Sequence, residues 1–201
     1  FPTAAFAVRP AMGAKAPTGI QMILGEGEEL FGEGDEAEFF YQVVSGAVRS
    51  CKLLSDGRRQ IDAFHLPGDI FAIEAGAEHR FSAEAVDRVT VIAYRRNRLA
   101  ALIQDDPTFR DKIMGATLRS LERAHDHMLL LGRKSAQEKV ATFLLDMAQR
   151  LSHDDENFEL PMTRADIADH LGLTIETVSR TLTQFVRSGL IRLLPAGRSI
   201  S

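Results

Sequence analysis

The chain of 201 residues has little cysteine, and its apolar residues do not gather in long runs. The single cysteine, Cys51, excludes a disulfide framework within the chain and a zinc or iron–sulfur site made of cysteines alone, because such sites need several thiolates. No apolar run approaches the roughly 18 residues of a membrane-spanning helix. We therefore expect no membrane contact and a location in the reducing cytoplasm.

Positive charge is not in excess either. The chain has 24 Lys and Arg residues against 28 Asp and Glu residues, which gives a formal net charge of −4. This balance argues against a general binder of polyanions. The charge is uneven, however, because residues 161–201 hold five arginines against three acidic residues, a net charge of +2. The C-terminal segment is therefore the part of the chain best suited to phosphate groups.

The segment from Ile20 to Arg95 consists of short apolar or alternating runs that are separated by turn residues. Runs spaced about 8–12 residues apart are typical of a small antiparallel sandwich or jelly roll. The clearest hairpin has its turn at Asp56-Gly57. Residues 1–18, with three prolines among small residues, are expected to form a loose N-terminal arm.

A long helix is predicted over residues 107–132. Pro107 suits the first turn of a helix, and Arg133 and Lys134 follow its end, where positive charge is favourable. Residues on one side of this helix alternate at spacings of three and four, as in the a/d seam of a coiled coil: Met114, Thr117, Leu121, Ala124, Met128 and Leu131. The seam predicts a homodimer; the alternative is a core helix that packs on its own domain.

Two helix starts lie close together after residue 160. Thr163 with Asp166 three residues later forms a capping box, and Thr174 begins a second helix after a turn at Gly172. Two short helices joined by a glycine turn are typical of a helix-turn-helix, whose second helix enters the major groove of DNA. The same pattern also occurs in proteins that never bind DNA.

The second helix has an apolar inner face and a polar outer face. Its inner residues are Val178, Leu182 and Phe185. Arg180 on the outer face is able to bond O6 and N7 of guanine together, and the Glu176 carboxylate is able to accept from N4 of cytosine. Ser179 and Gln184 share this outer face. The pattern that follows predicts a two-stranded wing near the DNA backbone: residues 190–193, a turn at Pro195-Ala196-Gly197, and residues from Arg198 onward.

Long stretches of the chain resemble one family. Residues 162–191, MTRADIADHLGLTIETVSRTLTQFVRSGLI, resemble the helix-turn-helix of Crp/FNR regulators. FYQVVSGAVRS followed by FHLPGDIF resembles their cyclic-nucleotide-binding-like jelly roll, and GDIFAIEAGAEHRFSAEA is similar to the FixK group. The resemblance implies an α+β protein with an N-terminal jelly-roll sensor domain (19–106), a dimerisation helix (107–132) and a C-terminal winged helix-turn-helix (133–201).

The resemblance also implies partners. The motif Glu176-x-x-Ser179-Arg180 matches the FNR and FixK branch, whose half-sites resemble TTGA. It implies a dimer bound to double-stranded palindromic DNA such as TTGA-N6-TCAA, recruiting RNA polymerase to genes of low-oxygen respiration, denitrification or nitrogen fixation. Four residues are expected to contact bases: Ile175, Glu176, Ser179 and Arg180. Five are expected to contact phosphates: Thr163, Arg164, Thr174, Thr177 and Arg198.

The hairpin turn matches the place where the family often touches RNA polymerase. Its charged residues are Asp56, Arg58 and Arg59. A hairpin tip that only faces solvent would have the same composition, so this assignment rests on the resemblance alone.

The sequence departs from the family where effectors bind. FNR holds its iron–sulfur cluster with several cysteines, and cyclic-AMP-binding members carry Phe-Gly-Glu where this chain has Phe71-Ala72-Ile73-Glu74. They carry an adjacent Arg-Ser pair where this chain has Arg80-Phe81-Ser82. We therefore expect no cofactor, and DNA binding without an added effector. A redox role for Cys51 is the alternative to a buried, inert thiol.

Two other classes of protein compete with this interpretation. A ligand- or haem-responsive repressor of the same fold is possible on sequence grounds, with His65 or His79 as an axial ligand. A cupin-type metal enzyme is suggested by Gly68, Gly76 and His79, which are spaced almost as in a cupin motif. A cupin also needs an upstream His-x-His and Glu, and before residue 68 the only histidine is His65, so a metal would have one or two ligands where about three are expected. No metal site and no enzyme activity are therefore expected.

Overall fold

The computed structural model describes residues 19–151, 157–193 and 199–200. The expected N-terminal arm, the turn at Pro195-Ala196-Gly197 and Arg198 lie outside the described residues. The chain forms two compact units. The N-terminal unit contains residues up to Lys52 together with Ala63–Leu121, and the C-terminal unit contains Leu53–Asp62 together with Glu122–Ser201. A short segment of the jelly-roll hairpin therefore belongs to the C-terminal unit.

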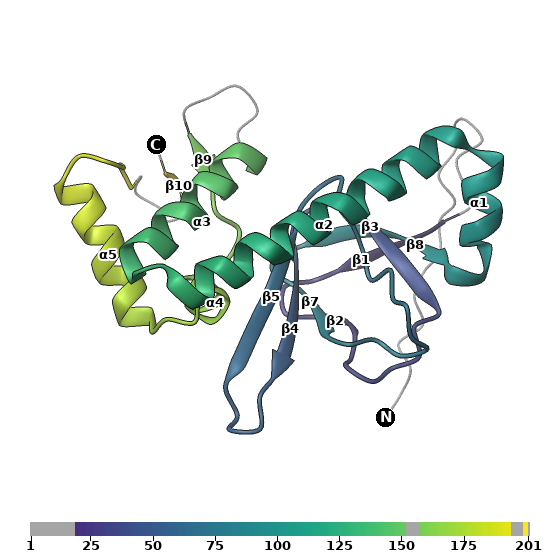
Figure 1. The fold of residues 1–201 in the computed structure, drawn as a ribbon, viewed down its shortest axis with the longest axis horizontal. Helices are drawn as coiled ribbons and strands as arrows, with labels where there is room; N and C mark the ends of the chain where they lie inside the picture. Colours follow the sequence, from purple (N-terminus) through teal and green to yellow (C-terminus); the bar gives the residue numbers. More distant parts are fainter. Residues whose placement is uncertain (1–18, 152–156, 194–198, 201) are drawn as a thin grey trace. The chain divides into compact units, whose positions relative to one another are not determined.

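The N-terminal unit is built from two four-stranded sheets (Figure 1). One sheet has the order β1-β8-β3-β6 and the other β2-β7-β4-β5. β5 crosses from one unit to the other, since its first residues belong to the C-terminal unit. The strands are β1 (Ile20–Leu24), β2 (Glu29–Phe31), β3 (Phe39–Ser45), β4 (Val48–Leu53), β5 (Arg59–His65), β6 (Ile70–Phe71), β7 (Ser82–Ala85) and β8 (Val89–Arg95).

Alternation along these strands creates the core between the sheets, because successive side chains of a strand point to opposite faces. Residues of both sheets contribute to it, among them Leu24, Tyr41, Val43, Val48, Phe71, Ala83, Val89 and Val91. A second cluster joins Phe40 and Tyr94 of the first sheet to Phe109 and Ile113 on a helix that follows. The jelly-roll interpretation of this segment is confirmed.

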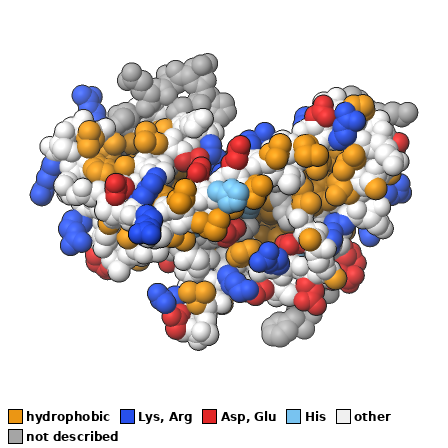
Figure 2. All heavy atoms as spheres, viewed as in Figure 1, with side chains coloured by type: hydrophobic (Ala, Val, Ile, Leu, Met, Phe, Trp, Pro, Cys, Tyr) orange, Lys and Arg blue, Asp and Glu red, His pale blue; other side chains and the backbone are white. Residues whose placement is uncertain are grey.

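Two helices follow the jelly roll, α1 (Leu99–Asp105) and the 27-residue α2 (Pro107–Arg133). Asp106 accepts a hydrogen bond from the backbone N–H of Phe109 at 3.1 Å, and Pro107 occupies the first turn as expected. Figure 2 shows hydrophobic side chains gathered along α2. The exposed stripe of α2 consists of Met114, Leu118, Leu121 and Met128, which are between 53% and 62% exposed.

Three helices and a small two-stranded sheet complete the C-terminal unit (Figure 1): α3 (Ala136–Leu151), α4 (Arg164–Leu171), α5 (Ile175–Arg187), β9 (Phe158–Glu159) and β10 (Ser199–Ile200). Their buried residues include Val140, Phe143, Met147, Ile167, Leu171, Val178 and Leu182. An isolated bridge joins Leu193 to Ile200 beside β9 and β10, at the base of the expected wing. The α+β class with a jelly roll, a long helix and a C-terminal helix-turn-helix is confirmed. Of the expected wing, the described residues contain β10 and the bridge at Leu193 but no strand over 190–193.

Candidate DNA interface

The first helix of the pair, α4, starts at a complete capping box. The Thr163 side chain accepts a hydrogen bond from Asp166 N–H at 3.1 Å, and the Asp166 carboxylate accepts from Thr163 N–H at 3.1 Å. Gly172 ends the helix with φ 60° and ψ 43°, a left-handed conformation that favours glycine. Local sequence therefore determines both the start of α4 and the turn that aims the next helix.

The second helix, α5, begins at Thr174, whose side chain accepts a hydrogen bond from Thr177 N–H at 3.2 Å. Its apolar residues Val178, Leu182 and Phe185 are buried as expected. At the start of the helix, Ile175, Glu176 and Arg180 are exposed and Ser179 is half-buried. The structure therefore brings the four expected base-contacting residues together within two turns at the N-terminal end of one helix.

The Glu176 carboxylate is held in its charged form. Hydrogen bonds from its own backbone N–H and from the Thr174 hydroxyl lower its pKa below the usual range. An ionised carboxylate accepts hydrogen bonds and donates none, which suits it to an amino group on a base edge. A helix N-terminus also favours negative charge.

The expected phosphate-contacting residues lie at the two helix starts. Thr163 and Thr174 are exposed caps, Thr177 is half-buried in the first turn of α5, and Arg164 is half-buried at the first position of α4. Backbone N–H groups at helix starts and nearby hydroxyls are common phosphate ligands. Four of the five residues therefore lie at the cap or in the first turn of α4 or α5. The fifth, Arg198, lies outside the described residues.

Supporting contacts come from α3, and the sequence did not point to them. Lys139 is buried, and its Nζ donates a hydrogen bond to the Leu171 carbonyl at 3.1 Å, at the end of α4. A lysine at that position complements the negative end of the helix. Gln137 Nε2 also donates to Gln184 Oε1 on α5 at 2.9 Å. Residue spacing does not indicate either contact, because the two partners are 32 residues apart in one and 47 residues apart in the other.

Two histidines stack inside the C-terminal unit. The rings of His127 on α2 and His170 on α4 lie 4.2 Å apart between centroids, and Phe143 lies next to His170. Burial, and secondarily the neighbouring His127, lowers the pKa of His170 to about 3. Burial also lowers the pKa of His127. Both imidazoles are therefore neutral at pH 7.

We expect acid to destabilise the protein through His170. Its unfolded form takes up a proton near pH 6.5, whereas the folded form stays neutral down to about 3, so stability is complete above pH 6.5 and falls below it. The contribution is at most about 1.4 kcal/mol per pH unit. Urea unfolding from pH 8 to pH 5 measures it, with His170→Gln as the comparison. An equal pH dependence in both proteins would contradict the assignment.

The effector cassette of the family corresponds to residues 71–82 of this chain, and one of its residues has an unusual backbone conformation. Ala72 has φ 59°, a left-handed conformation that costs a non-glycine residue about 1–2 kcal/mol. Glycine adopts this conformation without that cost, so the alanine here is strained. His79 packs on Phe31 with ring centroids 3.6 Å apart, and burial lowers the pKa of His79. A neutral imidazole provides no charge for a phosphate.

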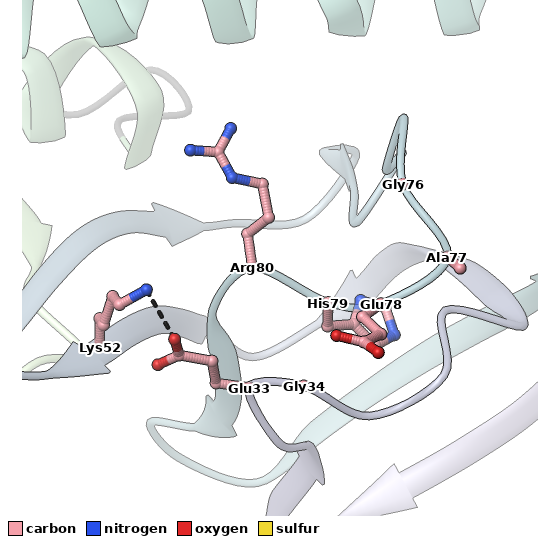
Figure 3. A pocket seen from close by; sticks show the side chains of 8 residues that line it. All are labelled: Glu33, Gly34, Lys52, Gly76, Ala77, Glu78, His79 and Arg80. Carbon is pink, nitrogen blue, oxygen red and sulfur yellow. Dashed lines mark ion pairs between the residues drawn. The ribbon is translucent and has the colours of Figure 1, made fainter.

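A surface hollow of about 410 Å³ lies beside this cassette (Figure 3). Its lining residues are Glu33, Gly34, Lys52, Gly76, Ala77, Glu78, His79 and Arg80. Lys52 is paired with Glu33 at 2.6 Å, and Figure 3 shows Arg80 extending away from both acidic side chains. A lining with a neutralised lysine and a second carboxylate does not fit a cyclic phosphate. Cys51 is buried in β4, as an inert thiol would be.

Among the described residues, no three His, Cys, Asp or Glu side chains are grouped so that they could hold a metal ion. Within the same described residues, no helix is long and apolar enough to cross a membrane.

A capped helix-turn-helix that presents a polar helix face, combined in one chain with a jelly roll and a long helix with an exposed apolar stripe, defines the class of DNA-binding transcription regulators. Two family models match accordingly. Residues 22–106 match the cyclic nucleotide-binding domain, and residues 138–201 match the Crp-like helix-turn-helix domain.

Individual relatives narrow the class further. The chain is 48% identical to the nitrogen fixation regulation protein FixK of Azorhizobium caulinodans over 96% of this chain and 78% of that protein. It is 44% identical to FixK of Bradyrhizobium diazoefficiens over 90% of this chain and 78% of that protein. The solved structure of FixK2 from Bradyrhizobium japonicum superposes with a TM-score of 0.84 at 49% identity and covers 91% of each chain. The protein belongs to the FixK branch of the Crp/FNR transcription regulators and is not an enzyme.

Proposed function

We propose that this regulator activates transcription by binding, as a homodimer, a palindrome of the type TTGA-N6-TCAA. The observation that carries the proposal is the start of α5, where Glu176, Ser179 and Arg180 lie above a capped turn. Arginine and carboxylate side chains at this place are suited to guanine and cytosine edges. The helix starts of α4 and α5 would then hold the phosphates on either side.

The stripe on α2 supports a dimer. Met114, Leu121 and Met128 are exposed at seven-residue spacing, and Leu118 widens the same face. Regulators with a two-fold axis read two half-sites one helical turn apart, about 34–36 Å. Thr117, Ala124 and Leu131 complete the proposed seam at the intervening positions.

The genes and the cellular setting follow from the relatives. The two FixK proteins are named for nitrogen fixation regulation, so we infer control of nitrogen fixation, denitrification or low-oxygen respiration in the cytoplasm. RNA polymerase is the proposed protein partner, and the hairpin tip is the proposed contact. Asp56 and Arg58 are exposed there and pair with each other at 2.7 Å. Arg59, the third residue of the expected contact, faces α4 instead.

A haem-responsive repressor of the same fold is the second candidate, with His65 or His79 as ligand. His65 bonds Ser50 through Nε2 at 2.7 Å and stacks on Phe71 at 4.3 Å between centroids. His79 stacks on Phe31. Both rings are committed to packing within the jelly roll, which favours the activator without haem.

The protein purified in air, with nothing added, is expected to bind its palindrome already. A ligand shifts a two-state equilibrium only through different affinities for the two states, and the cassette does not fit the ligand class of its family. The measurement is a titration of the TTGA-N6-TCAA duplex with protein that has no visible absorbance. Binding at about 10⁻⁸ M or tighter at moderate salt supports the proposal.

The matched control duplex has a spacer longer by about five base pairs, half a helical turn, which puts the half-sites on opposite faces. Tight binding should disappear on it. Tight binding that appears only with cyclic AMP, haem or anaerobic iron would instead establish an effector-dependent regulator.

A further inference from the structure

Arg59 binds the first helix of the helix-turn-helix, although it is more than a hundred residues away in sequence. Its Nη2 donates to Asp166 Oδ1 at 2.6 Å, and its Nε donates to Asp169 Oδ2 at 2.9 Å. The guanidinium is three-quarters buried. Two charge-assisted bonds from one planar group fix both the distance and the orientation of α4.

The residues after Arg59 continue the contact. Gln60 Nε2 donates to the His170 carbonyl at 3.3 Å, and His170 Nδ1 donates to the Ile61 carbonyl at 3.1 Å. Three consecutive residues of β5 thus each bind α4. The segment at the start of β5 is therefore an integral part of the C-terminal unit.

Asp166 takes part both in the capping box of α4 and in the ion pair with Arg59. Its side chain is only 2% exposed, and its Oδ2 accepts from Thr163 N–H at 3.1 Å and from the Thr163 hydroxyl at 2.8 Å. Its Oδ1 accepts from Arg59. A buried carboxylate that loses its cation is strongly destabilised, and it then protonates or moves toward water. Either change would disturb the capping box at the start of α4.

The start of α4 is also the part of the fold that is proposed to hold a phosphate. Thr163 and Arg164 lie there, and α4 packs against α5. A shift of the cap would move the phosphate ligands and, through the packing, the recognition residues. A misplacement of about 1 Å at such a contact is enough to weaken it.

The neighbouring arginine shows that this arrangement is specific. Arg58 is 77% exposed and pairs with Asp56 two residues earlier in the hairpin turn. Such a surface pair contributes little to stability. Two adjacent arginines of one hairpin therefore have different environments. Arg58 pairs within the hairpin, whereas Arg59 pairs with α4 of the helix-turn-helix.

We propose that Arg59 is a positioning residue for DNA binding, which holds the capping box of α4 in place by binding Asp166 and Asp169. The inference rests on the proposed DNA-binding function and adds to it a residue outside the helix-turn-helix. It gives Arg59 a different role from its neighbours in the hairpin tip, which remain the proposed polymerase contact.

The test uses the full chain with Arg59→Ala and Arg59→Lys. Thermal unfolding first establishes the temperature at which each variant is fully folded. At that temperature, we expect Arg59→Ala to bind the palindrome about tenfold more weakly, and lysine to restore part of the loss because it keeps the charge but not the fork. Hydrogen exchange without DNA should show faster exchange of the α4 amides. Arg110→Ala, which removes an arginine from an exposed pair with Asp111, is the matched control and should bind like the native protein.

The outcomes separate the possibilities. If folded Arg59→Ala binds the palindrome like the native protein, the inference is wrong, whatever happens to its melting temperature. Normal DNA binding with loss of transcription would assign Arg59 to RNA polymerase instead. A native protein that does not bind the palindrome would overturn the proposed function, while faster α4 exchange in Arg59→Ala would still reveal the positioning contact.

A milder variant covers the case in which Arg59→Ala does not fold. Asp169→Asn removes the charge of the half-buried partner and leaves the capping carboxylate of Asp166 with its arginine. It should bind the palindrome about two- to fivefold more weakly, because the second acceptor of the fork is then a neutral amide oxygen and its charge-assisted bond is lost. Adding Arg59→Lys to this variant should cause little further loss. Native affinity in Asp169→Asn together with native α4 exchange would contradict the inference.

Discussion

Leu121→Glu is expected to turn the dimer into a monomer and to remove tight binding to the palindrome. Leu121 is 53% exposed at the centre of the α2 stripe, between Met114 and Met128. In a dimer this position would lie against its counterpart, and two buried carboxylates there would repel each other without compensating cations. A monomer binds a single half-site and loses the contribution of the second one. Affinity for the full palindrome should therefore fall by about 100-fold or more.

Sedimentation equilibrium measures the change directly, and DNA titration measures its consequence. The control is Lys112→Glu, which adds the same side chain about 200° around the helix from Met114. Lys112 is exposed, and its variant should remain a dimer with native affinity. A Leu121→Glu protein that still sediments as a dimer would show that the partner surface lies elsewhere.

Arg180→Ala should reduce affinity for the palindrome by about 1–3 kcal/mol, which is roughly 5- to 150-fold, and change affinity for random DNA much less. Arg180 is exposed one turn into α5 and on the same side as Glu176. An arginine that bonds two acceptors of one guanine discriminates between sequences, whereas a phosphate contact does not. Parallel titrations of both duplexes over a range of salt concentrations measure the difference.

Arg164→Ala is the matched comparison, because it removes the same side chain from the start of α4. It should weaken binding to both duplexes alike and reduce the salt slope by about one unit, since one phosphate contact is lost. Equal losses for both variants on both duplexes would show that the two arginines do not have the assigned roles.

Local features of the fold were well predicted by the sequence. Thr163, Thr174 and Gly172 occupy their expected positions because caps and left-handed turns depend on residues three or four apart. The strands were also predictable, because alternate residues such as Val43 and Val91 are buried and this alternation is visible in a few neighbouring residues. The shared position of the proposed base-contacting residues was predictable because they lie at the start of a single helix.

Contacts between distant residues were not predictable. The partner of Arg59 is separated from it by 107 residues, and nothing in the sequence near either residue indicates the pair. The burial of Lys139 and the left-handed conformation of Ala72 likewise depend on tertiary packing that overrides local preference. As a result, the sequence predicts one charged surface at the hairpin tip, whereas the structure gives Arg58 and Arg59 two environments.

The dependence of α4 on the start of β5 has a consequence for the order of folding. Synthesis reaches Arg59 107 residues before Asp166, so the binding partner of this strand segment does not yet exist when the strand is made. The contact closes a long loop of chain, and such non-local contacts form late in folding. The C-terminal unit therefore becomes complete only after α4 has been synthesised, later than all strands of the jelly roll.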